Sequence, residues 1–186
     1  MVRLLGISGS LRKASYNTTL LRAAQQGAGS SVAIDIATLH GIPLYDGDVE
    51  ASSGVPEAVT ALKERIVASD ALLLATPEYN SSFPGVMKNA FDWLSRPPAD
   101  MARVFGGRPV AVLGASPSGF GTVLAQAAWL PVLRHLGAQI WTSSRLAVSA
   151  ANTKVDAEGN FDAATRAALS AFVQGFADWV QSRRAG

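Results

Sequence analysis

The chain contains no cysteine and only two histidines among its 186 residues. Without cysteine, disulfides, thiolate metal ligands and thiol redox chemistry are all excluded. His40 and His135 are far apart in the sequence, and neither has a second ligand at the spacing of a metal site. We therefore predict no metal site and a structural role for both histidines. Any redox chemistry must be carried by a bound cofactor.

A strong excess of one charge is also lacking. The 16 Lys and Arg residues nearly balance the 14 Asp and Glu residues, which gives a formal net charge of +2. Because the basic residues form no cluster, the composition argues against a nucleic-acid partner. No apolar run approaches the roughly 20 residues that cross a bilayer, and the first residues do not match a signal peptide. We expect a cytoplasmic protein with no membrane and no nucleic-acid partner.

Apolar runs alternate with amphipathic segments along the chain, and 48% of the residues are hydrophobic. This is enough for one domain, residues 1–186, with a substantial core. Several runs lack polar alternation, as strands do in a parallel sheet that is covered on both faces. The predicted strands are Val2 to Ser8, Ser31 to Ala37, Asp70 to Thr76, Pro109 to Ala115 and Gln139 to Val148. The predicted helices are Asn17 to Gly27, Pro56 to Ser69, Pro84 to Ser95, Gly121 to Leu136 and about Asp162 to Gln181.

Residues near the helix ends agree with these boundaries. Pro56 and Pro84 suit first-turn positions, Asp162 suits an N-cap, and Gly137 suits a helix stop. The five strand–helix units predict an α/β fold with a doubly wound, five-stranded parallel sheet. We expect the strand order 2-1-3-4-5, with helices on both faces.

Unusual polar residues collect after the first, third and fourth predicted strands, in residues 8–17, 76–83 and 116–122. In an open α/β sheet, ligands bind beyond the carboxyl ends of the strands, where the winding direction reverses. For the order 2-1-3-4-5 this place lies between strands 1 and 3, with the loop of strand 4 beside it. The three loops are therefore predicted to form one site.

The first of these loops lies in GISGSLRKASYNTTLL, residues 6–21, and suits a phosphate group. Backbone N–H groups at a helix N-terminus bind anions, and Gly9 lets the chain approach a ligand closely. The segment does not match the dinucleotide, nucleoside-triphosphate or nucleophile-elbow motifs. The alternative is a serine-rich turn that only caps the helix. Polar groups for a phosphate would come from Ser10, Arg12, Ser15, Asn17 and Thr18.

The second loop, TPEYNSSF over residues 76–83, suits a planar heterocycle. Pro77 stiffens the loop, while the Asn80 amide and backbone groups can recognise the N–H and carbonyl groups of a ring. Aromatic surface can cover the face of such a ring. Glu78 is explained equally well as a helix-end or ion-pair partner, and Tyr79 as a packing residue.

Three segments occur in order in the predicted loops and the helix after them: GSLRKASYN (9–17), IPLYDGD (42–48) and TPEYNSSFPGVMKNAFDWLSRP (76–97). Together they resemble the NADPH-dependent FMN reductase family, whose members are also described as chromate or quinone reductases. The similarity continues to NTKVDAEGNF (152–161). The resemblance implies a flavodoxin-like fold and non-covalently bound FMN. It assigns FMN-binding roles to Ser10, Arg12, Ser15, Asn17, Thr18, Pro77, Glu78, Tyr79, Asn80, Ser116 and Gly119.

The same resemblance implies an activity. Hydride would pass from NADPH or NADH to the flavin, and the electrons then to a quinone, a free flavin, an azo compound or a metal oxyanion such as chromate. The cofactor carries this chemistry, so no catalytic side chain is predicted. The family also implies a homodimer, or a homotetramer built from two dimers. Two alternatives stay open: a flavodoxin-type electron carrier without NAD(P)H turnover, and an esterase-like hydrolase that uses a loop serine.

Further features of the chain have more ordinary explanations beside functional ones. The helix at 84–95 has apolar residues on more than one stripe, so it either packs wholly in the core or turns one side to a partner subunit. Residues 41–54 and 97–108 are the longest irregular stretches and are expected to be loops. The first contains Asp46, Asp48 and Glu50, which lack the spacing of a calcium loop, so a solvated acidic turn is expected.

Overall fold

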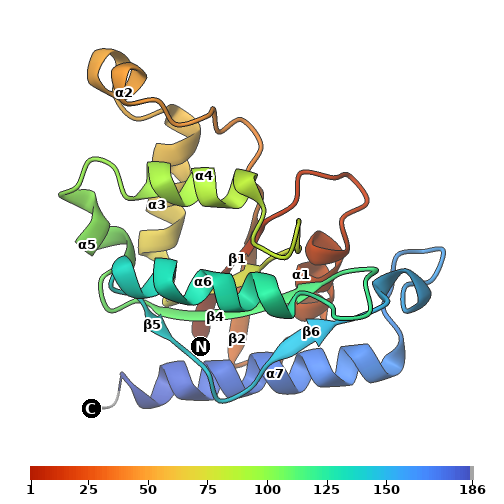
Figure 1. Cartoon of the computed structure of the whole chain (residues 1–186). Helices are drawn as coiled ribbons and strands as arrows, with labels where there is room; N and C mark the ends of the chain where they lie inside the picture. Colours follow the sequence, from red (N-terminus) through yellow and green to blue (C-terminus); the bar gives the residue numbers. More distant parts are fainter. Residues whose placement is uncertain (185–186) are drawn as a thin grey trace.

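The computed structural model describes residues 1–184 and contains one parallel sheet in the order β2-β1-β3-β4-β5, with β6 also paired to β4 (Figure 1). The strands are β1 (Val2–Ser8), β2 (Val32–Ala37), β3 (Ala71–Ala75), β4 (Pro109–Ala115), β5 (Gln139–Ile140) and β6 (Leu146–Val148). The helices are α1 (Tyr16–Gln26), α2 (Gly47–Ser53), α3 (Glu57–Ala68), α4 (Gly85–Leu94), α5 (Asp100–Phe105), α6 (Val123–His135) and α7 (Ala163–Ser182), with a 3₁₀ helix η1 (Ala151–Thr153). The predicted doubly wound, flavodoxin-like sheet and its strand order are confirmed.

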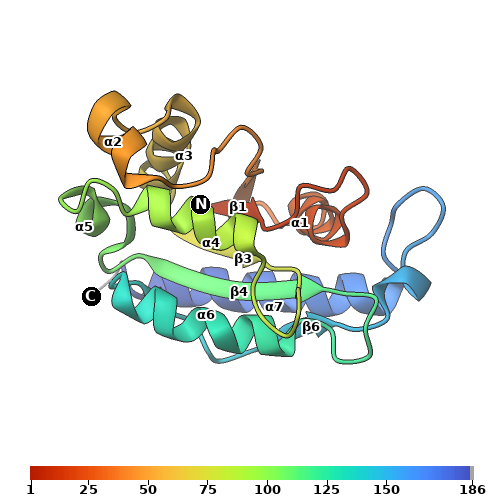
Figure 2. The ribbon, with the colours of Figure 1, turned by 45° about the horizontal axis from the view of Figure 1, so that its top comes forward.

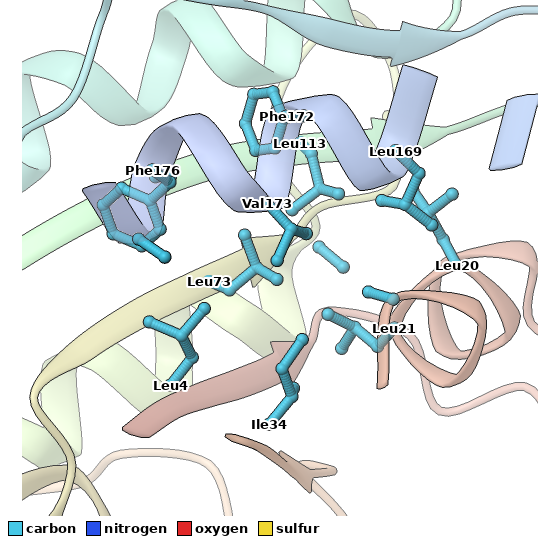
Figure 3. Close-up of a cluster of buried hydrophobic side chains, with 14 of the residues drawn as sticks. Leu4, Leu20, Leu21, Ile34, Leu73, Leu113, Leu169, Phe172, Val173 and Phe176 are labelled. Carbon is cyan, nitrogen blue, oxygen red and sulfur yellow. The ribbon is translucent and has the colours of Figure 1, made fainter. Parts of the chain in front are cut away.

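Helices cover both faces of the sheet (Figure 2). α1 and α7 pack against one face, and α3, α4, α5 and α6 pack against the other. Neighbouring residues of β1 show the alternation, because Leu4 belongs to the first core and Leu5 to the second. Figure 3 shows the first core, where Leu73 of β3 lies near Val173 of α7. Burial on both faces explains why the central strands are continuous apolar runs.

Side chains cap the first turns of α1 and α7. Ser15 is the N-cap of α1, and its hydroxyl accepts a hydrogen bond of 3.2 Å from the Thr18 N–H. Asp162 caps α7 by accepting a bond of 2.7 Å from the Thr165 N–H, as predicted. Within residues 1–184, none of these helices combines the length and the apolar character that crossing a membrane requires.

The predicted proline positions at two helix starts are wrong by one residue. Pro56 and Pro84 are the N-caps of α3 and α4, immediately before the first turn rather than within it. Their fixed φ still suits the entry into a helix. Gly137 follows the C-cap residue of α6, so the predicted helix stop is confirmed.

The fifth predicted strand, residues 139–148, is wrong as a single element. β5 ends opposite Val110 of β4, and β6 begins opposite Leu113. More residues separate β5 from β6 than separate their partners on β4, so residues 142–145 leave the sheet. The side chains explain the break: Trp141 is buried against α7, whereas the polar TSSR that follows is exposed.

Two segments predicted as loops contain short helices, which corrects the prediction. In residues 41–54, the Asp46 side chain caps α2 by accepting a hydrogen bond of 2.9 Å from the N–H two residues later. In residues 97–108, α5 is held where Asp100 pairs with the buried Lys63 at 2.9 Å. Both helices are too short to show the apolar periodicity from which helices are predicted.

The helix α4 buries its apolar side chains within this chain. The Trp93 indole N–H donates 2.9 Å to the Pro43 carbonyl, and the Tyr45 ring packs edge-on against the Trp93 ring. Pro43 and Tyr45, in the segment after β2, therefore cover the second apolar stripe of α4. Core packing accounts for the buried residues of this helix, which are Met87, Ala90, Phe91, Trp93 and Leu94.

Glu50 of α2 is also held by its own chain. The Arg96 guanidinium donates 2.8 Å to the Glu50 carboxylate, and the Tyr45 hydroxyl donates 2.9 Å to the same oxygen. These hydrogen bonds, chiefly the one from Arg96, hold the pKa of Glu50 below its ordinary value. The acidic residues predicted as a solvated turn thus cap a helix and pair with an arginine.

Candidate functional site

The three polar loops meet at one pocket of about 200 Å³ at the carboxyl ends of β1, β3 and β4. A larger hollow of about 310 Å³ lies beside Arg3 and Arg65, toward the amino ends of β1 and β2. Ligands of open α/β sheets bind at the carboxyl ends, which favours the three-loop pocket. Its lining contains most of the predicted site residues, namely Ser10, Arg12, Ser15, Asn17, Pro77, Glu78, Tyr79 and Ser116.

The amino end of α1 opens into this pocket. The Ser15 hydroxyl satisfies the Thr18 N–H, but the helix offers no acceptor to the N–H groups of Tyr16 and Asn17. Arg12 is exposed on the same loop, and its guanidinium forms no ion pair with any residue in 1–184. Free N–H groups, the positive end of the helix dipole and one unpaired guanidinium together form a site for an anion.

Gly9 is required by the packing of the first two loops against each other. A Cβ at this position would lie 2.6 Å from the Met87 sulfur and 2.8 Å from Pro77 Cδ. From the sequence, Gly9 is predicted to let the ligand approach the chain closely. The structure gives a different reason, because the second loop and α4 already occupy the space.

Asn17 and Thr18 use their side chains inside the protein. The Asn17 amide donates to the Ala115 carbonyl and accepts from the Ala115 N–H, both at 2.9 Å. The Thr18 hydroxyl lies 2.8 Å from the Ser8 hydroxyl and is buried. These side chains fix the loop to β4 and β1. What Asn17 offers the pocket is its backbone N–H, and Thr18 does not line the pocket.

His40 lies closer to the first loop than its position after β2 suggested. Its Nε2 atom is 3.2 Å from the Leu11 carbonyl oxygen, and its Nδ1 atom is 3.1 Å from the Thr38 hydroxyl. The sequence predicts that His40, in the loop after the second strand, lies away from the three-loop site, and this prediction is wrong. Its role is nevertheless structural, because both ring nitrogens are engaged and the contact braces the backbone of the loop.

The second loop is a tight hairpin that the sequence analysis did not identify. Tyr79 and Ser82 exchange two backbone hydrogen bonds, of 2.9 and 3.1 Å, across Asn80 and Ser81. Both central residues have positive φ, 50° and 61°, as in a type I′ turn. Asparagine at the first central position was the available signal. The turn leaves Asn80 exposed and outside the pocket lining, whereas Tyr79 stays at the pocket with 45% of its surface exposed.

Glu78 acts as a remote cap for α6. Its Oε2 atom accepts hydrogen bonds from the N–H groups of Leu124 and Ala125, at 2.9 and 3.0 Å. These N–H groups belong to the first turn of α6, which has no side-chain cap of its own. The helix-end role considered for Glu78 is therefore confirmed. The carboxylate joins the second loop to the helix that follows the third.

The third loop is held by hydrogen bonds within itself and to the segment after β6. The Ser118 N–H donates to the Ser116 hydroxyl at 3.2 Å, and the Ala151 N–H donates to the Ser116 carbonyl at 3.0 Å. Ser116 lines the pocket together with Pro117, which the sequence analysis did not select. Gly119 lies outside the lining, and a Cβ there would meet no atom within 4 Å.

Comparison with known proteins identifies the chain. Residues 2–153 match the family described as NADPH-dependent FMN reductase. The chain belongs to this family. An NAD(P)H-dependent FMN reductase of Pseudomonas aeruginosa is 42% identical over 184 residues, which cover 98% of this chain and 97% of that protein. A 2-hydroxy-1,4-benzoquinone reductase of a Burkholderia species is 38% identical over 179 residues, 96% of each protein.

A solved structure supports the same assignment. The flavoenzyme NAD(P)H:(acceptor) oxidoreductase FerB of Paracoccus denitrificans superposes with a TM-score of 0.86 at 36% identity, over 98% of both chains. This member of the NADPH-dependent FMN reductase family is thus a flavoprotein oxidoreductase that uses FMN and NAD(P)H. The pocket fits the phosphate of FMN, because free N–H groups and an unpaired guanidinium converge at its α1 end.

Proposed function

We propose that FMN binds in the three-loop pocket and that the protein reduces quinone-type acceptors with NAD(P)H. The pocket lining supports this most, because loops distant in sequence surround one space with the residues that the FMN motifs predict. The relatives named as reductases of FMN and of a benzoquinone support the choice of substrate class.

The α1 end of the pocket is assigned to the FMN phosphate. The N–H groups of Tyr16 and Asn17 point along the helix axis toward this end, and Arg12 adds a fixed positive charge. The Ser10 hydroxyl already accepts a bond of 3.3 Å from the Arg12 N–H, so it remains able to donate its proton to a phosphate oxygen. Ser15 contributes mainly as the cap of α1.

The second-loop end of the pocket is assigned to the flavin ring. Pro77, Glu78 and Tyr79 line this end, and Tyr79 is half-exposed at its rim. The pocket, at about 200 Å³, is smaller than the roughly 300–1,000 Å³ typical of sites that enclose a ligand, so a flavin held there would be partly open to a second substrate. When bound, FMN supplies the redox chemistry by accepting hydride from NAD(P)H and releasing two electrons to the acceptor.

A homodimer is part of this proposal. Leu44, Tyr45 and Val49 are 84%, 38% and 41% exposed along one segment, which forms an apolar surface on the single chain. Such surfaces commonly mark protein interfaces. Sedimentation velocity of the wild type and of L44D tests it. A dimer that the substitution dissociates supports the proposal, and a wild-type monomer contradicts it. For a homotetramer, the mass derived from sedimentation would be four times that of one chain.

A cytoplasmic location follows from the proposed use of NAD(P)H, which cells regenerate in that compartment. Cell fractionation with an antibody tests it. Recovery of the protein with an envelope fraction would contradict the proposed location.

The electron-carrier and hydrolase alternatives receive less support. The relatives described above are named as reductases or oxidoreductases rather than as carriers. For a serine hydrolase, a histidine would have to activate Ser10, but the ring nitrogens of His40 already contact Leu11 and Thr38.

The test combines absorption with turnover. Purified protein loaded with FMN should retain the visible flavin spectrum through gel filtration. It should then oxidise NADPH or NADH with 1,4-benzoquinone well above the rate of the same concentration of free FMN. Azo compounds and chromate are tested in the same assay. Retained flavin without turnover would favour the electron carrier, and lack of flavin binding would contradict the assignment of the pocket.

A further inference from the structure

Phe120, at the tip of the third loop, is unusually exposed for an aromatic residue. Of its surface, 81% is accessible, against 45% for Tyr79 at the rim of the pocket. An apolar ring that stays in water contributes no burial free energy to the fold. Neither core packing nor a helix cap accounts for this side chain.

The loop that carries Phe120 is a turn closed by hydrogen bonds. Ser118 and Gly121 are joined by two hydrogen bonds, from the Gly121 N–H to the Ser118 carbonyl and from the Ser118 hydroxyl to the Gly121 carbonyl. The Ala150 N–H also donates 3.0 Å to the Ser118 carbonyl. Phe120 thus lies in a turn that is closed between Ser118 and Gly121 and tied to Ala150, and its side chain is exposed.

This turn stands beside the proposed flavin ring. Ser116 and Pro117, at its start, line the pocket. The α6 turn just after it is bound to Glu78, whose neighbour Tyr79 also lines the pocket. Figures 1 and 2 both show residues 77–83 and the loop between β4 and α6 side by side at the same end of the molecule.

We propose that Phe120 is a specificity-determining residue that stacks against planar aromatic acceptors while they lie over the flavin. The inference rests on the proposed function. A planar aromatic acceptor is chosen as the occupant because the turn that starts at the pocket lining carries an exposed aromatic residue. Aromatic rings attract each other in stacked geometries. A second copy of the chain covering Phe120 is the competing explanation, and the experiment separates the two.

The experiment compares F120A with F120Y, which restores a ring, and with L130A, which removes an exposed leucine from α6 away from the loop. For each FMN-loaded protein, kcat/KM is measured with 1,4-naphthoquinone and with ferricyanide, an acceptor without an aromatic ring. The ratio of the two values should fall roughly 3- to 10-fold in F120A. F120Y and L130A should keep the wild-type ratio. The Kd of 2-naphthol, a planar ring that is not reduced, should rise by a similar factor in F120A only, measured by calorimetry.

Three results would overturn the proposal. The ratio could stay unchanged in F120A, the Kd of 2-naphthol could stay unchanged, or F120A could alter the sedimentation of the protein, which would show that another copy covers the ring. These outcomes differ from failure of the proposed function. In that case the wild type would transfer electrons from NAD(P)H to neither acceptor.

Discussion

Asn17 at the start of α1 and Ala115 at the end of β4 are joined by two hydrogen bonds of 2.9 Å, although 98 residues separate them. One amide side chain pairs with both backbone groups of a single residue, as a neighbouring strand would. Asn17 is 3% exposed. This contact holds the first loop against the third and sets the direction of the α1 N-terminus in the pocket.

Replacing Asn17 tests that relationship. N17A leaves the N–H and carbonyl of Ala115 without partners in a buried place, so it should lower the free energy of unfolding by about 2–4 kcal/mol. FMN affinity should weaken by roughly tenfold, because the α1 N-terminus is no longer fixed. Urea unfolding and FMN titration measure the two effects.

Gln25 provides the control on the same helix. Its side chain donates a single bond of 2.7 Å to the Ile34 carbonyl, far from the pocket. Q25A should cost about 1 kcal/mol and leave FMN affinity unchanged. Equal FMN affinity in N17A and Q25A would contradict the positioning role of Asn17.

The Glu78 carboxylate should matter for stability as a helix cap. E78A leaves the Leu124 and Ala125 N–H groups without an acceptor and should cost about 0.5–2 kcal/mol. E78Q should cost less, because an amide oxygen still accepts. The control D162A removes the cap of α7, so it should lower the free energy of unfolding by a similar amount. Because α7 does not line the pocket, D162A should leave FMN affinity unchanged. If E78A unfolds at the wild-type urea concentration, the cap contributes nothing.

The buried Lys63 depends on Asp100 for its counter-charge. The side chains are 2% and 29% exposed, respectively, and lie 2.9 Å apart. D100N leaves a buried ammonium with no paired charge and should cost about 2–3 kcal/mol in urea unfolding. E64Q, which breaks the exposed Arg103–Glu64 pair, should cost less than about 1 kcal/mol. A cost for D100N as small as that for E64Q would contradict this account of the pair.

The same pair predicts a dependence on pH. The hydrogen bond from Lys63 lowers the pKa of Asp100 below its ordinary value of 3.8. A lowered folded-state pKa means that the stabilisation is complete above the unfolded pKa and is lost as the pH falls through the folded one. The difference in unfolding free energy between wild type and D100N should stay constant from about pH 7 to 5 and narrow below about pH 4. A constant difference down to about pH 2 would exclude Asp100 as the titrating group.

Particular residues show how far the sequence predicts this protein. Continuous apolar strands and capped amphipathic helices indicate the layers, because burial on both faces leaves a direct pattern. The strand order comes from the doubly wound fold class rather than from the strands themselves. The Asn17–Ala115 and Glu78–Leu124 contacts leave none, since they join polar side chains to backbone groups of distant segments. The motifs include most of the residues that line the pocket. They do not distinguish side chains that face the ligand from those of Asn17 and Thr18, which support the loop.

The central claim is that FMN places its phosphate at the α1 end of the pocket, and titration of the apoprotein with FMN and with riboflavin tests it most directly. R12A should raise the Kd of FMN by roughly 10- to 150-fold, equivalent to about 1.5–3 kcal/mol for a charge-assisted hydrogen bond. Riboflavin, which has no phosphate, should bind R12A and wild type equally. R22A, which removes an exposed arginine farther along α1, should bind FMN as the wild type does. Unchanged FMN affinity in R12A, or an equal loss for riboflavin, would contradict the assignment of the pocket.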